Sequence, residues 1–209
     1  MNWGQAPKTV DMEFITMAAS FSVENTKATD QFLFEQLLDI AFGIERRVKT
    51  SYRLRVGSTP VDGLSLVVRD AEVGVAGSIS FWPLAVGKTG TPALLLGPLV
   101  VHPKRKNLGV GLTLMQEGLA RAKARGHGLV ILVGDAPYYA RVGFEKLPEG
   151  QLLMPGPLDP ARFLYVELVP GALAVTHGLV LPPHRFAEIS VPFAVPHQAE
   201  RQKQSAECQ

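Results

Sequence analysis

A strand, a loop, a helix and a second strand follow one another between residues 93 and 133, and this succession constrains the fold most. The run "ALLLGPLVV" (93–101) has few polar positions, which predicts a strand buried on both faces. From Gly109 to Gly126 apolar residues recur with helical spacing, and "LVILV" (129–133) predicts another buried strand. A helix that joins two strands in this way implies a right-handed crossover and parallel pairing.

Two further strands precede this unit. Residues 64–69 and 73–86 are predicted strands separated by a turn at 70–72, and a hairpin loop at 87–90 follows the second. With 93–101 they form an antiparallel meander. We therefore predict an α/β fold whose mixed, mostly antiparallel sheet has a central parallel strand pair flanked by helices.

The rest of the chain contains shorter patterns. We expect one domain over residues 1–187 and a flexible C-terminal tail over 188–209, which is polar from His197 onward. Five basic residues in the segment 45–55 are interpreted as a solvated face. The other predicted elements are an edge strand at 14–20, a helix over 32–41 that ends at Gly43, a short helix over 135–142, a late strand at 162–168 and an irregular stretch at 182–196.

Composition excludes several classes of protein. The formal net charge of +2 does not fit a nucleic-acid-binding protein, which usually carries a strong basic excess. The single cysteine, Cys208, rules out a disulfide framework and a cysteine-rich metal site. The five histidines lie far apart without the spacing of a ligand pair, so we expect no bound metal.

The sequence also predicts where the protein resides. No apolar run approaches the roughly 20 residues that a membrane helix needs, so we expect no membrane partner. Residues 14–23 are mildly apolar, but Asp11 and Glu13 precede them, where a signal peptide requires positive charge. We therefore expect a cytoplasmic protein.

The stretch "KRKNLGVGLTLM" (104–115) carries the strongest functional signal. Glycines just before a helix are typical of loops that bind phosphate on backbone amides. The dinucleotide fingerprint fails because Leu114 stands where the third glycine belongs, and because a long loop separates Val101 from Gly109. The Walker pattern fails because this stretch contains no Gly-Lys-Ser/Thr.

Two motifs together resemble the GNAT N-acetyltransferases. "VVHPKRKNLGVGLTLM" is similar to their cofactor loop, Gln/Arg-x-x-Gly-x-Gly/Ala after a buried strand, and "YYARVGF" (138–144) is similar to their later helix end. Lys106 departs from the usual Gln or Arg and offers a point charge instead. Asn107 replaces a frequent glycine and tolerates left-handed backbone angles. The upstream segments "TSYRLR", "LSLVV", "SISFWPL" and "LLLGPL" resemble a bacterial subgroup of this family with largely undefined substrates.

This resemblance implies an acetyl-CoA-dependent N-acetyltransferase that transfers the acetyl group directly to an amine, without a metal. It implies that loop amides hold the pyrophosphate at a helix N-terminus and that the preceding strand pairs with the pantetheine amides. Lys104, Arg105 and Lys106 are candidates to meet the ribose phosphate. The cofactor-binding residues implied are Leu99, Val100, Val101, Lys106, Asn107, Leu108, Gly109, Val110, Gly111 and Leu112.

The resemblance also implies a catalytic residue. Tyr139, four residues before Gly143, stands at the position of the acid that protonates the leaving thiolate, although packing against the cofactor or the core is the competing interpretation. The acceptor amine must also lose a proton, which at pH 7 costs roughly 4–5 kcal/mol for a lysine-like amine. The base is left open among Glu72, His102, Asp135 and Glu167, and candidates for the acceptor cleft are Phe42, Arg53, Trp82 and Phe163.

Other functions remain as alternatives. The main one is a non-catalytic acyl-CoA-binding sensor or interaction module on the same fold, and a nucleotide-binding oxidoreductase is a more distant one. The expected partner is a small-molecule or peptide amine. The sequence leaves open the acceptor's identity, the role of the tail and the oligomeric state, with a homodimer among the possibilities.

Overall fold

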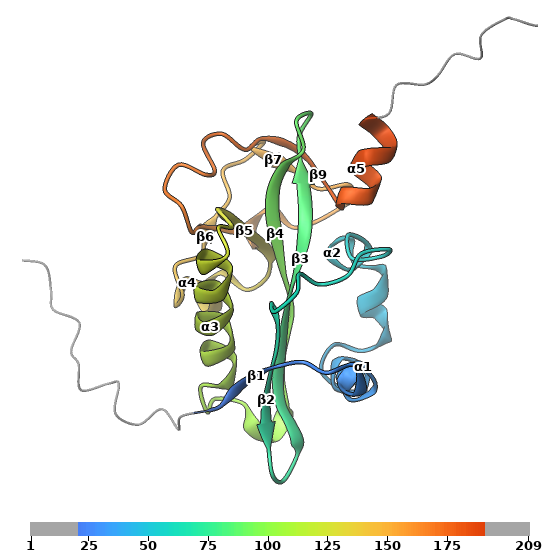
Figure 1. Ribbon diagram of the computed structural model, residues 1–209, viewed down its shortest axis with the longest axis vertical. Coiled ribbons are helices and arrows are strands. Elements are labelled where there is room, and N and C mark those ends of the chain that lie inside the picture. The colour runs from blue at the N-terminus through green and yellow to red at the C-terminus, as the bar shows by residue number, and fades with distance from the viewer. Residues whose placement is uncertain (1–20, 191–209) are drawn as a thin grey trace, which may run out of the picture.

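The structure is a computed structural model that describes residues 21–190, so the strand expected at 14–20 lies outside the described residues. Its strands form a mixed sheet in the order β1-β2-β3-β4-β5-β8-β6, and β9 joins β7 to β3 (Figure 1). The strands are β1 (Val23–Asn25), β2 (Ser65–Asp70), β3 (Gly74–Val86), β4 (Thr91–Val101), β5 (Leu129–Val133), β6 (Glu145–Lys146), β7 (Leu152–Leu153), β8 (Phe163–Glu167) and β9 (Gly178–Leu181).

The strand pairing confirms the predicted fold class. Strands β2, β3 and β4 form the expected antiparallel meander. Strands β4 and β5 pair in parallel, with Leu94 opposite Val130 and Leu95 opposite Ile131. The parallel pair lies inside the sheet because β5 also pairs with β8, which is antiparallel to it.

Helices cover both faces of the sheet (Figure 1). Helix α3 packs its apolar side chains, including Val110, Leu114 and Met115, in one buried cluster with Ile79 and Phe81 of β3. Helices α1 and α2 lie on the opposite face. The helices are α1 (Gln31–Phe42), α2 (Thr50–Arg53), α3 (Val110–Ala124), α4 (Ala136–Ala140) and α5 (Pro183–Ser190), with 3₁₀ turns η2 (Ala28–Asp30), η3 (Ile44–Val48), η4 (Pro103–Arg105) and η5 (Pro160–Arg162).

Helix α1 forms where the periodicity predicted it and ends at Gly43, which has a φ of 69°. Its buried face differs from the expected one. Leu37 and Leu38 are buried and pack with Phe34, whereas Phe32 and Ile40 of the expected apolar stripe are exposed. The period is therefore correct, but the side of the helix that meets the sheet is set by tertiary packing.

The C-terminal part contains the main error of the secondary-structure prediction. Residues 183–190, expected to be irregular, form α5, which begins at a proline, where the missing N–H is tolerated. Helix α5 packs Phe186 close to Gly90 of the β3–β4 hairpin. The short strands β6, β7 and β9 had no sequence signal, and the division of the chain at residue 187 stays a prediction.

No helix between residues 21 and 190 has both the length and the apolar composition that crossing a membrane requires.

Candidate active site

The parallel strands β4 and β5 diverge and leave part of β4 with a free edge. Their pairing ends at Leu95 and Ile131, but β4 continues to Val101 and is paired there only with β3. On the β5 side, the backbone groups of residues 97–101, where Pro98 has a C=O but no N–H, therefore have no strand partner. Such an edge can accept an extended ligand as an additional strand.

A cleft of about 640 Å³ lies beside this edge, and we call it the β4–β5 cleft. Among the described residues, five basic side chains line it and one acidic side chain, Asp135, does so, which suits anionic ligands. Five of the ten residues expected to bind the cofactor line it: Leu99, Val100, Val101, Lys106 and Asn107. The basic residues are Arg46, Lys49, Arg55, Lys106 and Arg162.

The other five expected residues, 108–112, lead from the cleft into α3. The first hydrogen bond of this helix runs from the Thr113 N–H to the Gly109 carbonyl at 2.9 Å. Within the described part of the chain, the N–H groups of residues 109–112 donate no backbone hydrogen bond. These free donors and the positive end of the helix dipole form an anion-binding group. Since the Val110 side chain is buried in the core, Val110 can contribute only through its backbone.

Left-handed backbone angles shape this loop. Asn107 has a φ of 62°, as the tolerance of asparagine for that region predicts. Gly109 has a φ of 88° and caps α3, and a β-carbon placed on it would meet no atom. The space in front of Gly109 is therefore open to a ligand.

Gly111 has a packing reason to be glycine in addition to the expected approach of a phosphate. It is buried, and a β-carbon there would collide with the hydroxyl of Tyr138 and press on Val101. Glycine at this position thus allows Tyr138 of α4 to approach α3.

Tyr139 lines the β4–β5 cleft together with Tyr138. Its ring packs edge-on against Phe144, with centroids 5.8 Å apart, and against Tyr138 at 5.3 Å. Burial raises the pKa of Tyr139 to about 12. The hydroxyl has no hydrogen-bond partner among residues 21–190, yet no polar side-chain atom there is both buried and unpartnered. The hydroxyl is therefore accessible at the cleft. Its raised pKa keeps it protonated at neutral pH.

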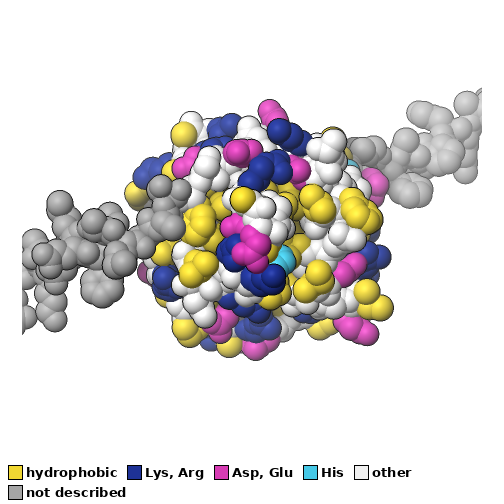
Figure 2. Space-filling view, turned by 90° about the horizontal axis from the view of Figure 1, so that it is seen from below, with side chains coloured by type: hydrophobic (Ala, Val, Ile, Leu, Met, Phe, Trp, Pro, Cys, Tyr) yellow, Lys and Arg dark blue, Asp and Glu magenta, His cyan; other side chains and the backbone are white. Residues whose placement is uncertain are grey.

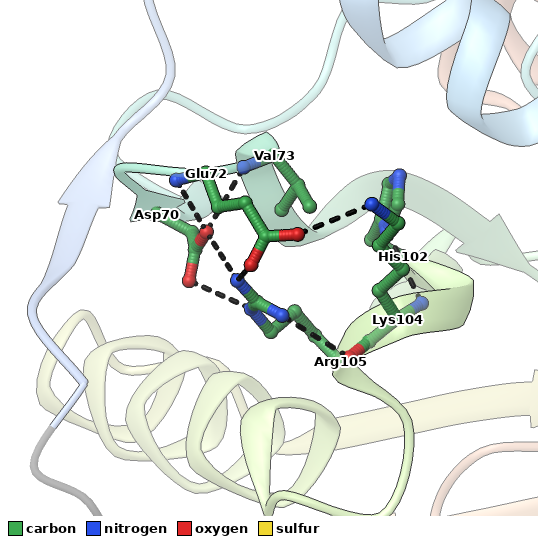
Figure 3. Close-up of polar contacts among 6 residues, drawn as sticks. All are labelled: Asp70, Glu72, Val73, His102, Lys104 and Arg105. Atoms are coloured by element: carbon green, nitrogen blue, oxygen red, sulfur yellow. Dashed lines mark hydrogen bonds and ion pairs between the residues drawn. The ribbon is translucent and has the colours of Figure 1, made fainter.

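The basic trio of the loop divides into two parts. The Arg105 guanidinium donates two hydrogen bonds to the Asp70 carboxylate, at 2.8 and 2.9 Å, and one to Glu72 (Figure 3). The Lys104 ammonium donates to Glu72 at 3.1 Å. Both cations, which were candidates to meet the ribose phosphate, are thus paired with carboxylates at the turn between β2 and β3. Lys106 alone lines the cleft, without an ion-pair partner in the described chain.

On the face seen from below, Lys and Arg side chains lie among Asp and Glu side chains rather than in a patch of one sign (Figure 2). The concentration of positive charge is therefore a property of the β4–β5 cleft, not of this outer surface.

A second cleft, of about 600 Å³, lies between α1 and the other end of the same sheet face, and we call it the α1–β3 cleft. Its sheet wall is polar, because Ser78, Ser80 and Trp82 of β3 face it in alternation. The Trp82 indole donates a hydrogen bond to the Gly97 carbonyl of β4 at 2.6 Å. The two clefts meet at four shared residues: Leu38, Arg46, Arg55 and Pro98.

The basic segment 45–55 is only in part the solvated face that its composition indicated, because Arg47, Lys49 and Arg53 are exposed but Arg46 and Arg55 are not. Arg46 is buried and is held by Glu35 and Asp39 of α1, with 3.0 Å between its Nε and the Asp39 carboxylate. Arg55 lines both clefts. The spacing of Glu35 and Asp39, one helical turn apart, was the sequence signal for an arginine partner.

Few of the expected bases and acceptor contacts reach either cleft. Trp82 lines the α1–β3 cleft, and Phe42 and Asp135 line the β4–β5 cleft. Glu35, Asp62 and Tyr52 line the α1–β3 cleft but had no distinguishing motif. The remaining candidates line neither cleft: Arg53 is exposed, Phe163 is in the core, Glu72 is ion-paired, His102 accepts a hydrogen bond from the Lys104 N–H, and Glu167 accepts from the N–H groups of Gly171 and Leu173.

Among residues 21–190, no three His, Cys, Asp or Glu side chains gather closely enough to hold a metal ion. The donors of the two clefts are amides, hydroxyls and cations, which suit an anionic organic ligand.

Known proteins are similar to this chain over much of its length. Residues 17–147 match the model of a family described as "Acetyltransferase (GNAT) domain". Two uncharacterized N-acetyltransferases of Escherichia coli K12 are similar to the chain. YhbS is 32% identical over 117 residues, which span 56% of this chain and 70% of YhbS. YjhQ is 29% identical over 127 residues, 60% of this chain and 70% of YjhQ.

Solved structures support the same relationship. The E. coli YhbS structure in complex with CoA superposes with a TM-score of 0.67 at 27% identity, over 80% of this chain and 92% of YhbS. A GNAT family acetyltransferase from Brucella melitensis in complex with acetyl-CoA gives a TM-score of 0.54 at 26% identity, over 72% of this chain and 89% of that one.

Proposed function

Because this chain belongs to the GNAT family of N-acetyltransferases, we propose that it transfers the acetyl group of acetyl-CoA directly to a primary amine of an acceptor. The free edge of β4, which leads through residues 97–101 into the donor-rich loop, is the observation that carries this proposal. Acetyl-CoA has two pantetheine amides that such an edge can pair, and a pyrophosphate that the loop can bind.

We assign the binding of acetyl-CoA to three groups of residues. The backbone of Leu99, Val100 and Val101 pairs with the pantetheine arm. The N–H groups of residues 107–112 hold the pyrophosphate, with Gly109 leaving room for it. The Lys106 ammonium adds a positive charge that can follow the phosphates on a flexible stem.

In the transfer step, the nitrogen lone pair of the amine attacks the thioester carbonyl carbon. The C–S bond then breaks and coenzyme A leaves as a thiolate, while the proton lost by the nitrogen ends on the sulfur. Tyr139 lies on the β5 side of this cleft and remains protonated, because its pKa of about 12 is far above neutral pH.

The same pKa specifies the role of Tyr139. Complete proton transfer from this phenol to a thiolate, whose parent thiol has a pKa of about 8.5, would be uphill by roughly 5 kcal/mol. We therefore assign Tyr139 as a hydrogen-bond donor that stabilises the developing thiolate. The thiolate then takes its proton from the acceptor side.

The test is a panel of amines incubated with acetyl-CoA, read out by the mass of the acetylated product and by free CoA thiol. The proposal predicts that both products rise together for at least one amine class, and that neither rises with Gly109→Asp. Tight binding of acetyl-CoA without release of thiol by any amine would instead support a non-catalytic acyl-CoA sensor.

A further inference from the structure

Arg55 occupies the junction of the two clefts. It follows α2 and lines both the β4–β5 cleft and the α1–β3 cleft. Pro98 of β4, in the segment assigned above to the pantetheine side, belongs to the same junction. A group bound by Arg55 would thus lie between the acetyl donor and whatever occupies the α1–β3 cleft.

The Arg55 guanidinium lacks a carboxylate partner among residues 21–190. Its Nε donates to the Ser51 carbonyl at 3.2 Å, and its Cζ lies 4.7 Å from the centroid of the Tyr52 ring and 5.8 Å from that of Trp82. These contacts orient the guanidinium plane but leave both terminal nitrogens without an acceptor. Those nitrogens are accessible from the clefts, because every fully buried side-chain nitrogen or oxygen in the described chain has a hydrogen-bond partner and these two have none.

Other partly buried arginines of this protein are neutralised. Arg46 is paired with Glu35 and Asp39, and Arg105 is paired with Asp70 and Glu72. Arg55 differs because burial lowers its pKa to about 10, yet at neutral pH it still carries its charge. A desolvated cation whose N–H groups lack acceptors lowers the stability of the fold unless an anion binds to it.

The surrounding charges define what that anion can be. The α1–β3 cleft is also lined by Lys27, Glu35, Arg46 and Asp62, and Glu35 is already held by Arg46. Two acidic side chains in the same cleft disfavour a doubly charged phosphate. A single carboxylate matches the one planar fork that Arg55 presents.

We infer that the acceptor is an amino-acid-like amine, with a carboxylate a few bonds from the acetylated nitrogen, and that Arg55 binds this carboxylate. The inference rests on the proposed function and specifies its substrate class. The carboxylate lies at the junction, so that the nearby amine faces the β4 edge. The rest of the acceptor lies along Ser78, Ser80 and Trp82.

The experiment compares amino acids with their carboxamides and with the amines that lack the carboxyl group. We expect the wild-type protein to favour the carboxylate form roughly tenfold to a hundredfold in kcat/KM, as one charge-assisted pair implies. Arg55→Gln should remove this preference through KM, and Arg55→Lys should retain part of it. Arg53→Gln is the matched control, because Arg53 is exposed and lines neither cleft.

A binding measurement without turnover separates this inference from the proposed function. In the presence of CoA, carboxylate ligands should perturb the NMR signals of the wild-type protein but not those of Arg55→Gln. Acetyl-CoA should bind both proteins equally, which also shows that the variant is folded. The inference is overturned if carboxylates and carboxamides bind or react equally, or if Arg55→Gln weakens the binding of acetyl-CoA instead of the binding of carboxylates. Failure of all acetyl transfer with selective carboxylate binding would count against the proposed function alone.

Discussion

The Tyr139 side chain packs in the protein with its ring and faces the proposed reaction site with its hydroxyl. The ring is held between Tyr138 and Phe144, and the hydroxyl is left unpaired at the β4–β5 cleft. Burial that raises the pKa of a phenol makes it a poor acid but a permanent hydrogen-bond donor. The position of this residue was predictable from the sequence, whereas the balance between acid and donor was not.

We predict that Tyr139→Phe lowers kcat by roughly a hundredfold to a thousandfold, the range for the loss of a transition-state donor, and leaves the Kd of acetyl-CoA unchanged. In the wild-type protein, turnover should not fall through ionisation of Tyr139 until the pH nears 12. Steady-state kinetics over pH and a binding titration check both statements.

Tyr165→Phe provides the control for this change. Tyr165 lies on β8, donates a hydrogen bond to Glu145 at 3.3 Å and lines neither cleft. An unchanged kcat for Tyr139→Phe would remove the residue from the chemistry and leave it only a packing role.

Single residues also show what sequence patterns leave out. The phosphate-loop pattern predicted that both glycines of the loop lie at a phosphate. It did not predict that Gly111 also makes room for the hydroxyl of Tyr138, which is 27 positions later in the chain. Likewise, the sequence showed the basic run of the loop, but it did not show that two of its three cations would form ion pairs with Asp70 and Glu72. Such pairings depend on which turns the fold brings together.

At the scale of elements, the ion pairs of Figure 3 fasten η4 to the turn between β2 and β3. Asp70 also accepts hydrogen bonds from the N–H groups of Glu72 and Val73, so that one carboxylate orders the turn and holds Arg105. Residues 103–105 lead directly into the loop that faces the cleft. We infer that this clamp fixes where the loop begins.

We predict that Asp70→Asn lowers the melting temperature at neutral pH and makes the melting temperature less dependent on pH in the acid range. The Arg105 guanidinium holds the pKa of Asp70 well below its usual range. The clamp therefore contributes stability above about pH 4, the ordinary pKa of an aspartate, and loses it as the pH falls toward the lowered value. Thermal melts of both proteins between about pH 2 and pH 7 measure the difference.

Lys104→Gln tests whether the effect belongs to the clamp or to surface charge in general. The pair of Lys104 with Glu72 is exposed, with 66% and 58% of the two side chains accessible, so its loss should matter little. Parallel melting curves for the wild-type protein and Asp70→Asn across this pH range would contradict the account.

The elements themselves were predictable to different degrees. The long strands and α3 follow from apolar runs and periodicity, because their burial requires that composition. Helix α5 was missed because prolines were interpreted as breakers, although Pro183 begins the helix. The exposed Phe32 and Ile40 of α1 also could not be anticipated, since the sheet contacts another side of the helix.

At the scale of the whole molecule, the proposed function depends on two clefts on one sheet that meet at Arg55 and Pro98. The parallel strand pair beside the first could be predicted from a strand, a helix and a second strand, and the cofactor loop from its resemblance to the GNAT family. The second could not. Its walls come from α1, β2 and β3, whose contributing residues form no motif and lie far apart in the sequence.

The central claim is that acetyl-CoA binds along β4 and on the loop amides at Gly109. Calorimetric titration of acetyl-CoA into the wild-type protein, Gly109→Asp and Gly150→Asp tests it most directly. Both glycines have positive φ and open space around them, at 88° and 76°, but Gly150 lies outside both clefts. The account predicts saturable binding to the wild-type protein and Gly150→Asp, and none to Gly109→Asp, where a carboxylate meets the pyrophosphate. Equal binding by all three proteins, or by none, would contradict it.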